Sequence, residues 1–248
     1  MFFTFKKWTA LYILCLILLF AGLSLIAIRG KAVQASAPAA TESGGVVLVL
    51  DPGHGGEDGG AVAADGTVES QINLAIALQI EEIAQLLGMD TEMTRREDIS
   101  IHDAGSETLR QKKVSDLKNR VALINSVSGG ILLSIHQNSM PTAPSVHGAQ
   151  AFYNGTDGSE ALAQDIQTAL NSFINEEATP KSPKRIRESI YLMKNVTVPA
   201  VLVECGFLSN PQETARLQTS IYQTRLAMTI LSGVMGHFNA PARHTPAA

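Results

Sequence analysis

Three apolar runs of this sequence end in a side chain that could bind a metal ion or move a proton. The side chains are His54, His136 and Glu204, and the runs before them are 46–50, 131–135 and 198–203. Short apolar runs of this kind are typical of strands buried on both faces of a mostly parallel sheet. Ligands bind outside the carboxyl ends of such strands. A lone histidine in a glycine-rich turn is more often an ordinary loop residue, but three such strand ends favour one shared site.

A fourth candidate, Glu69, begins an amphipathic helical pattern after the glycine-rich turn around His54. Two imidazoles and one carboxylate with an open fourth position form the ligand set of a catalytic zinc site. His54, Glu69 and His136 supply this set. A zinc ion there would acidify a water molecule and polarise a carbonyl, while Glu204 would serve as the general base. The four residues therefore predict hydrolysis of an amide.

The whole chain of 248 residues favours one domain with appendages. Its formal net charge of −4 gives no basic footprint, which excludes the nucleic-acid-binding class. The two cysteines, Cys15 and Cys205, cannot support a disulfide framework, and neither resembles a zinc ligand.

Residues 1–31 contain an uncharged, largely apolar run from Trp8 to Ile28, preceded by Lys6 and Lys7. This length suits an uncleaved membrane anchor, because a signal-peptide core needs only about 7 to 15 residues. The alternative is a secretory signal that is cut within residues 33–37. In both cases we expect the rest of the chain to be exported. Residues 32–45 have the composition of a linker.

Strand and helix patterns alternate over residues 46–238, which predicts a single α/β domain with a mostly parallel central sheet and helices on both faces. Residues 97–111 are expected to form a surface loop, and residues 239–248 a flexible tail. Further strands are expected at 89–94, 147–153 and 190–193, and helices at 158–173, from Asn210 to about His237, and around Val114 to Ile124.

Several polar residues have an open role. His147 is either an active-site group or a loop residue. Arg120 is either a substrate contact, or a solvated arginine or a helix-surface ion pair. The segment 181–187 carries four positive charges, which would attract an anionic polymer if it lay near a cleft. The candidate substrate-binding residues are Asn138, His147, Arg185 and Arg187.

Four features together resemble the zinc-dependent N-acetylmuramoyl-L-alanine amidases of the amidase-3 family: the motifs 51–56, 134–138 and 204–210, and Glu69. The resemblance covers residues 46 to about 238. It implies zinc on the two histidines and Glu69, catalysis by Glu204, and cleavage between the lactyl group of muramic acid and L-alanine in peptidoglycan. Gln137 and Cys205 stand where other residues are common in the family, but neither is a ligand or the base.

Within that family, segments 116–120, 185–187 and 190–194 resemble the germination-specific amidases of endospore formers. This narrower likeness implies work on spore cortex peptidoglycan in the intermembrane space of the developing spore. There, removal of the peptide prepares muramic acid for conversion to a lactam by a partner deacetylase. The rival functions are a general wall amidase in cell separation, a zinc carboxypeptidase and a non-enzymatic wall-binding module.

Overall fold

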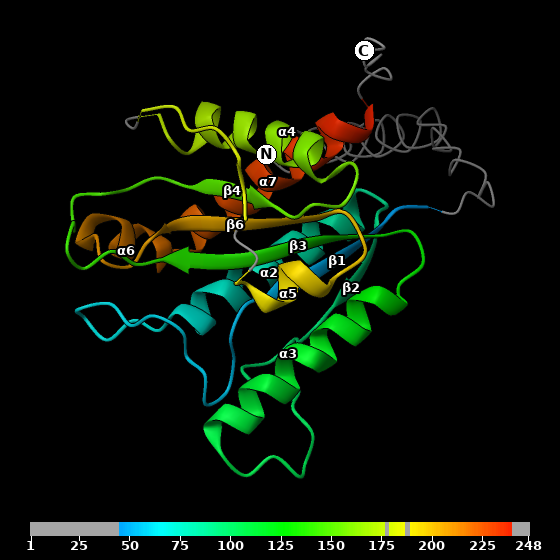
Figure 1. Ribbon diagram of the computed structural model, residues 1–248. Coiled ribbons are helices and arrows are strands. Elements are labelled where there is room, and N and C mark those ends of the chain that lie inside the picture. The colour runs from blue at the N-terminus through cyan, green and yellow to red at the C-terminus, as the bar shows by residue number, and fades with distance from the viewer. Residues whose placement is uncertain (1–44, 177–178, 187–188, 240–248) are drawn as a thin grey trace, which may run out of the picture. The chain divides into compact units, whose positions relative to one another are not determined.

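The computed structural model of the chain describes residues 45–176, 179–186 and 189–239 (Figure 1). The expected N-terminal anchor or signal, nearly all of the linker and nearly all of the tail lie outside these residues. Among the helices that are described, none has both the length and the apolar character that a membrane crossing requires.

Six strands in the described ranges form one sheet in the order β2-β1-β3-β6-β4-β5. Four neighbouring strands, from β2 to β6, run parallel, whereas β4 is antiparallel to β6 and β5 is parallel to β4. The mostly parallel sheet of a single α/β domain is therefore confirmed. The strands are β1 Val47–Pro52, β2 Asp90–Met93, β3 Gly130–Asn138, β4 Gln150–Tyr153, β5 Lys184–Arg185 and β6 Ala200–Phe207.

Helices cover both faces of the sheet, as expected (Figure 1). Leu48 and Leu50 of β1 point into one apolar layer, and Val49 between them points into the other. The first layer is closed by α2 Glu69–Leu86, α4 Ser159–Phe173, α6 Pro211–Leu217 and α7 Ser220–Asn239. The second is closed by α3 Leu109–Ser126 and α5 Tyr191–Asn195.

The start of α2 is fixed by backbone contacts rather than by a side-chain cap. Its N-cap residue, Val68, makes no capping hydrogen bond. Instead the N–H groups of Glu69 and Ser70 donate to the carbonyls of Ala61 and Gly59, at 2.9 and 3.0 Å. These contacts satisfy two of the unpaired N–H groups of the first turn. The loop after β1 therefore holds the carboxylate of Glu69 at the carboxyl edge of the sheet.

The expected strand at residues 190–193 is wrong, because these residues enter the short helix α5. Leu192, Met193 and Val196 are all buried in the layer beneath α3. Their spacing suits one helical face, whereas a strand would turn consecutive residues to opposite sides. The short strand β5 was not expected, and the single C-terminal helical region is divided into α6 and α7.

Candidate active site

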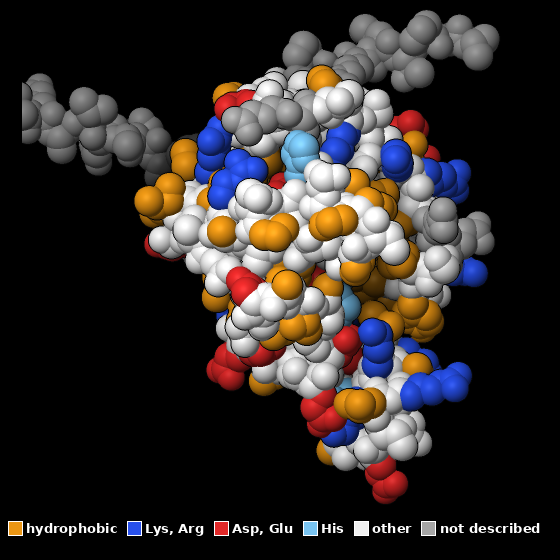
Figure 2. All heavy atoms as spheres, turned by 90° about the vertical axis from the view of Figure 1, so that its left-hand side faces the viewer, with side chains coloured by type: hydrophobic (Ala, Val, Ile, Leu, Met, Phe, Trp, Pro, Cys, Tyr) orange, Lys and Arg blue, Asp and Glu red, His pale blue; other side chains and the backbone are white. Residues whose placement is uncertain are grey.

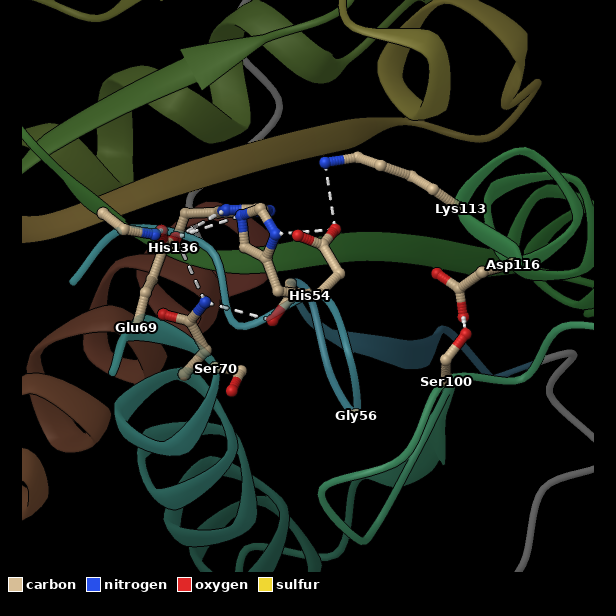
Figure 3. Close-up of polar contacts among 12 residues, drawn as sticks. His54, Gly56, Glu69, Ser70, Ser100, Lys113, Asp116 and His136 are labelled. Carbon is tan, nitrogen blue, oxygen red and sulfur yellow. Dashed lines mark hydrogen bonds and ion pairs between the residues drawn. The ribbon is translucent and has the colours of Figure 1, made fainter. Parts of the chain in front are cut away.

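The structure brings the three expected metal ligands together at the carboxyl edge of the sheet (Figure 3). His54 follows β1, Glu69 opens α2 and His136 lies on β3. Glu69 Oε1 lies 3.4 Å from His54 Nε2 and 3.0 Å from His136 Nδ1. One potential ligand atom from each residue falls within 4.8 Å of the others. We call these three residues the metal triad.

The donor chemistry of the metal triad fits a divalent cation. The backbone N–H of Ala61 donates to Glu69 Oε2 at 2.8 Å, which leaves Oε1 directed at the two histidines. Burial opposes ionisation of Glu69, but the hydrogen bond and charge of His136 outweigh it and lower the pKa of this carboxyl to about 2. Glu69 is therefore ionised at neutral pH, as a metal ligand must be.

The turn that carries His54 has an uncommon backbone. His54 has φ of 62°, and no other non-glycine residue in the described ranges has a positive φ. Such a conformation costs on the order of 1–3 kcal/mol, so the surroundings must hold it in place. At Gly53 an added Cβ would meet the His136 ring at 2.2 Å, and at Gly55 it would meet the Ile99 carbonyl at 2.4 Å. The glycines therefore let the turn pass close to a second ligand and to the loop after β2.

Asp58 lies behind His54 and was not expected from the sequence. Its Oδ2 lies 3.1 Å from His54 Nδ1 and 3.0 Å from the Nζ of Lys113, which reaches over from α3 (Figure 3). The hydrogen bond from His54, and then that from Lys113, lower the pKa of Asp58 below its usual range, against the effect of burial. A carboxylate at Nδ1 fixes the orientation of the ring and leaves Nε2 for a metal ion.

Glu204 lies opposite His136 in the parallel pairing of β3 and β6. Its Oε2 is buried and has no hydrogen-bond partner among the described residues. Burial raises the pKa of Glu204 to about 7, although the nearby His136 lowers it. A carboxyl group with this pKa can exchange a proton near neutral pH, as a general base must.

The metal triad and Glu204 line one cavity of about 390 Å³. Figure 2 looks onto the carboxyl edge of the sheet, where a histidine side chain is visible inside a hollow bordered by apolar and charged side chains. Lys113 and residues 189–192 also line the cavity, and the sequence alone did not place them there. Nothing in the local pattern indicates that α5 folds over this edge.

The prediction of a solvated or surface-paired Arg120 was wrong, because its side chain is only 2 % exposed. Arg120 does line the metal-site cavity, and its role as a substrate contact stays a prediction. Its Nη1 lies 2.7 Å from Asp51 Oδ1, and its Nε lies 2.8 Å from Asp116 Oδ2. Two further hydrogen bonds run to the carbonyls of Pro52 and His54. Arg120 therefore holds the turn that carries His54 in place through its backbone carbonyls.

The remaining candidates lie in different places. Asn138 ends β3 two residues after His136, and its Oδ1 accepts from the N–H of Ser139. His147 is exposed, and its Nδ1 lies 2.9 Å from the Ser145 carbonyl. Arg185 lies on β5 beside a separate cavity of about 330 Å³. The metal-site cavity is not lined by His147 or Arg185, and Arg187 is outside the described residues.

Comparison with known proteins identifies the family. Residues 48–235 match the family described as N-acetylmuramoyl-L-alanine amidase (Amidase_3). The chain is 40% identical over 195 residues to the germination-specific N-acetylmuramoyl-L-alanine amidase of Bacillus subtilis (strain 168), covering 78% of this chain and 80% of that protein. It is 29% identical to N-acetylmuramoyl-L-alanine amidase AmiA of Escherichia coli (strain K12), covering 82% and 80%.

A solved structure agrees. The CwlD amidase from Clostridioides difficile, determined in complex with the GerS lipoprotein, matches with a TM-score of 0.74 and 36% identity. The match covers 78% of this chain and 98% of that chain. This chain belongs to the Amidase_3 family and is an N-acetylmuramoyl-L-alanine amidase that acts on peptidoglycan.

Proposed function

We propose that this amidase is a zinc enzyme in which the metal triad (His54, Glu69 and His136) holds the ion and Glu204 moves the proton. The observation that carries the proposal is the convergence of three ligand atoms within 4.8 Å, in one cavity with an unpartnered carboxylate oxygen of Glu204. When bound, zinc acidifies water and polarises a carbonyl. Asp58 would keep the His54 ring oriented so that Nε2 is available to the ion.

In the reaction, the water oxygen adds to the lactyl carbonyl carbon, and the bond from that carbon to the nitrogen of L-alanine breaks. Glu204 Oε2 accepts the proton that the water loses and delivers it to the departing amine. A pKa of about 7 suits a group that must both accept and release this proton near neutral pH. Asn138, at the end of β3, is proposed to contact the substrate near this centre.

We further propose that the substrate is spore cortex peptidoglycan and that the product is passed to a deacetylase during muramic lactam formation. The support is the 40% identity to the germination-specific amidase and the structural match to CwlD. Residues 1–31 serve as a membrane anchor or export signal, residues 32–45 as a linker and residues 239–248 as a tail. Because peptidoglycan lies outside the cytoplasm, the enzyme acts extracytoplasmically, here between the two membranes of the developing spore.

The zinc proposal is tested by metal analysis of the purified full-length protein in mild detergent. We expect about one zinc ion per chain, since structural and catalytic sites of this type bind a single ion. His136→Ala should lose the metal and the activity together. Active wild-type protein without zinc, or a fully active His136→Ala variant, would contradict the site.

The spore role is tested by deleting the gene in its host. We expect cortex that lacks muramic lactam, with normal division. Chains of unseparated cells with normal cortex would support the rival, a general wall amidase. The carboxypeptidase and wall-binding readings do not agree with the family match, and product peptides that begin with L-alanine, with no release of free D-alanine, would exclude them directly.

A further inference from the structure

Two buried arginines hold the turn that carries His54. Three consecutive backbone carbonyls of this turn accept hydrogen bonds from them. Arg95 donates from Nε to Pro52 O at 2.9 Å and from Nη2 to Gly53 O at 3.1 Å. Arg120 donates from Nη1 to Pro52 O at 2.9 Å and from Nη2 to His54 O at 2.7 Å.

Arg95 is buried, yet it forms no ion pair with any residue that the structure describes. All four of its hydrogen bonds go to backbone carbonyls, two of them to Ser70 and Glu97 at 2.9 Å each. Removing a guanidinium from water without a paired carboxylate is costly. Its hydrogen bonds instead connect the turn of His54 to the carbonyl of Ser70, the residue next to Glu69.

Arg120 reaches the turn from α3. Two carboxylates, Asp51 and Asp116, fix its guanidinium at 2.7 and 2.8 Å. Its Nη2 then donates to the carbonyl of His54, which alone among the described non-glycine residues has a positive φ. Such a conformation persists only where the surroundings over-determine it.

We propose that Arg95 and Arg120 form a carbonyl clamp that sets the metal-binding geometry of His54 before the ion arrives. Both are positioning residues, since their hydrogen bonds go to the backbone of the turn and its neighbours rather than to the metal-binding atoms. The proposal rests on the proposed role of His54 as a zinc ligand. Outer partners that orient metal ligands commonly change metal affinity by about 10- to 100-fold.

The test is the zinc affinity of the full-length protein in mild detergent, measured by competition with a chelator. Arg95→Lys keeps the positive charge, but one ammonium cannot reach all four carbonyls. We expect its zinc dissociation constant to rise by about 10- to 100-fold. Arg96→Lys is the matched control, because Arg96 is the next residue, is 51% exposed, and pairs with Glu81 rather than the turn. Its dissociation constant should stay near that of the wild type.

Thermal unfolding of the zinc-free proteins shows whether a variant affects only the metal site or the fold as a whole. A clamp predicts a loss of zinc affinity in Arg95→Lys while the zinc-free protein still unfolds cooperatively. If Arg95→Lys does not fold, the same two measurements are made on Arg120→Lys. This variant retains the positive charge beside Asp51 and Asp116, but its side chain is too short to reach His54 O. Failure of both variants to fold would overturn the proposal, since the arginines would then be needed by the fold itself.

The same titration separates this proposal from the zinc proposal. If the wild type binds zinc no more tightly than His54→Ala, the metal site itself is wrong. If the wild type binds zinc and His54→Ala does not, while the Arg95→Lys and Arg120→Lys variants both match Arg96→Lys, only the clamp is wrong.

Discussion

Asn73 Oδ1 accepts a hydrogen bond from Gln137 Nε2 at 3.1 Å, which joins α2 to the residue that follows His136. The same amide donates from Nδ2 to Gly53 O at 3.1 Å and to Glu69 Oε1 at 3.3 Å. One fully buried side chain therefore contacts the segments that carry all three ligands of the metal triad.

Asn73→Leu should weaken both the fold and the metal site, because a similar volume remains while three buried hydrogen bonds are lost. We expect the free energy of unfolding to fall by about 1–3 kcal/mol and zinc affinity by about tenfold or more. Urea unfolding and chelator competition measure the two effects. Asn175→Leu is the control, since Asn175 is also buried but bonds to the backbone of Ala149. Equal loss of zinc affinity in both variants would show that Asn73 acts only through stability.

Glu204→Gln should keep zinc and lose most activity. The amide preserves the shape of the side chain but cannot accept the proton of the attacking water, a role commonly worth about 100- to 10,000-fold. Turnover on peptidoglycan and zinc content are measured on the same preparation. Glu69→Gln is the contrasting variant, because it should lose zinc along with activity. Near-normal turnover by Glu204→Gln would show that Glu204 is a carboxylate of β6 without a role in proton transfer.

The location of the site was predictable because the rule behind it is topological. Parallel strands bring their carboxyl ends to one edge, so His136 and Glu204 meet wherever their strands pair. The position of Glu69 followed from a helix that returns to the same edge.

The supporting residues were not predictable because they depend on the path of the loops. Arg95 and Lys113 reach the turn of His54 from the loop after β2 and from α3, and no periodicity encodes such contacts. The burial of Arg120 was not expected because its partner Asp51 is identified only once β1 and α3 are packed, although Asp116 lies four residues before it on the same helix. The helix α5 was mistaken for a strand because four apolar-rich residues are too few to show a period.

The stability of the zinc-free protein should decrease as the pH falls below about 4 to 5. Burial opposes ionisation of Asp51, but the charge and hydrogen bond of Arg120 outweigh it and hold the pKa of Asp51 below its usual range. A carboxyl group whose pKa is lower in the folded protein than in the unfolded chain stabilises the fold at any pH above its unfolded-state pKa, which is about 3.9. This stabilisation is lost as the pH falls through the folded-state pKa.

Asp51→Asn tests this relationship. It should lower the free energy of unfolding near neutral pH by roughly 3–5 kcal/mol, because Arg120 loses a buried partner, and it should flatten the decrease in acid. Urea unfolding from about pH 7 to about pH 3, with a chelator present, gives both quantities. Asp157→Asn, at an exposed position, is the control. An unchanged acid slope in Asp51→Asn would place the pH dependence elsewhere.

Cys205 should be inert in the folded enzyme even though it is the neighbour of Glu204. The two side chains point to opposite faces of β6, and Cys205 is fully buried in the layer beneath α2, α4 and α7. Burial raises the pKa of its thiol well above the usual range, so the reactive thiolate is scarce. In a Cys15→Ser background, a thiol reagent should modify Cys205 only after unfolding in guanidinium chloride, and Cys205→Ala should retain turnover. Rapid labelling of the native protein with loss of activity would instead indicate a thiol that participates in catalysis, which the metal mechanism does not allow.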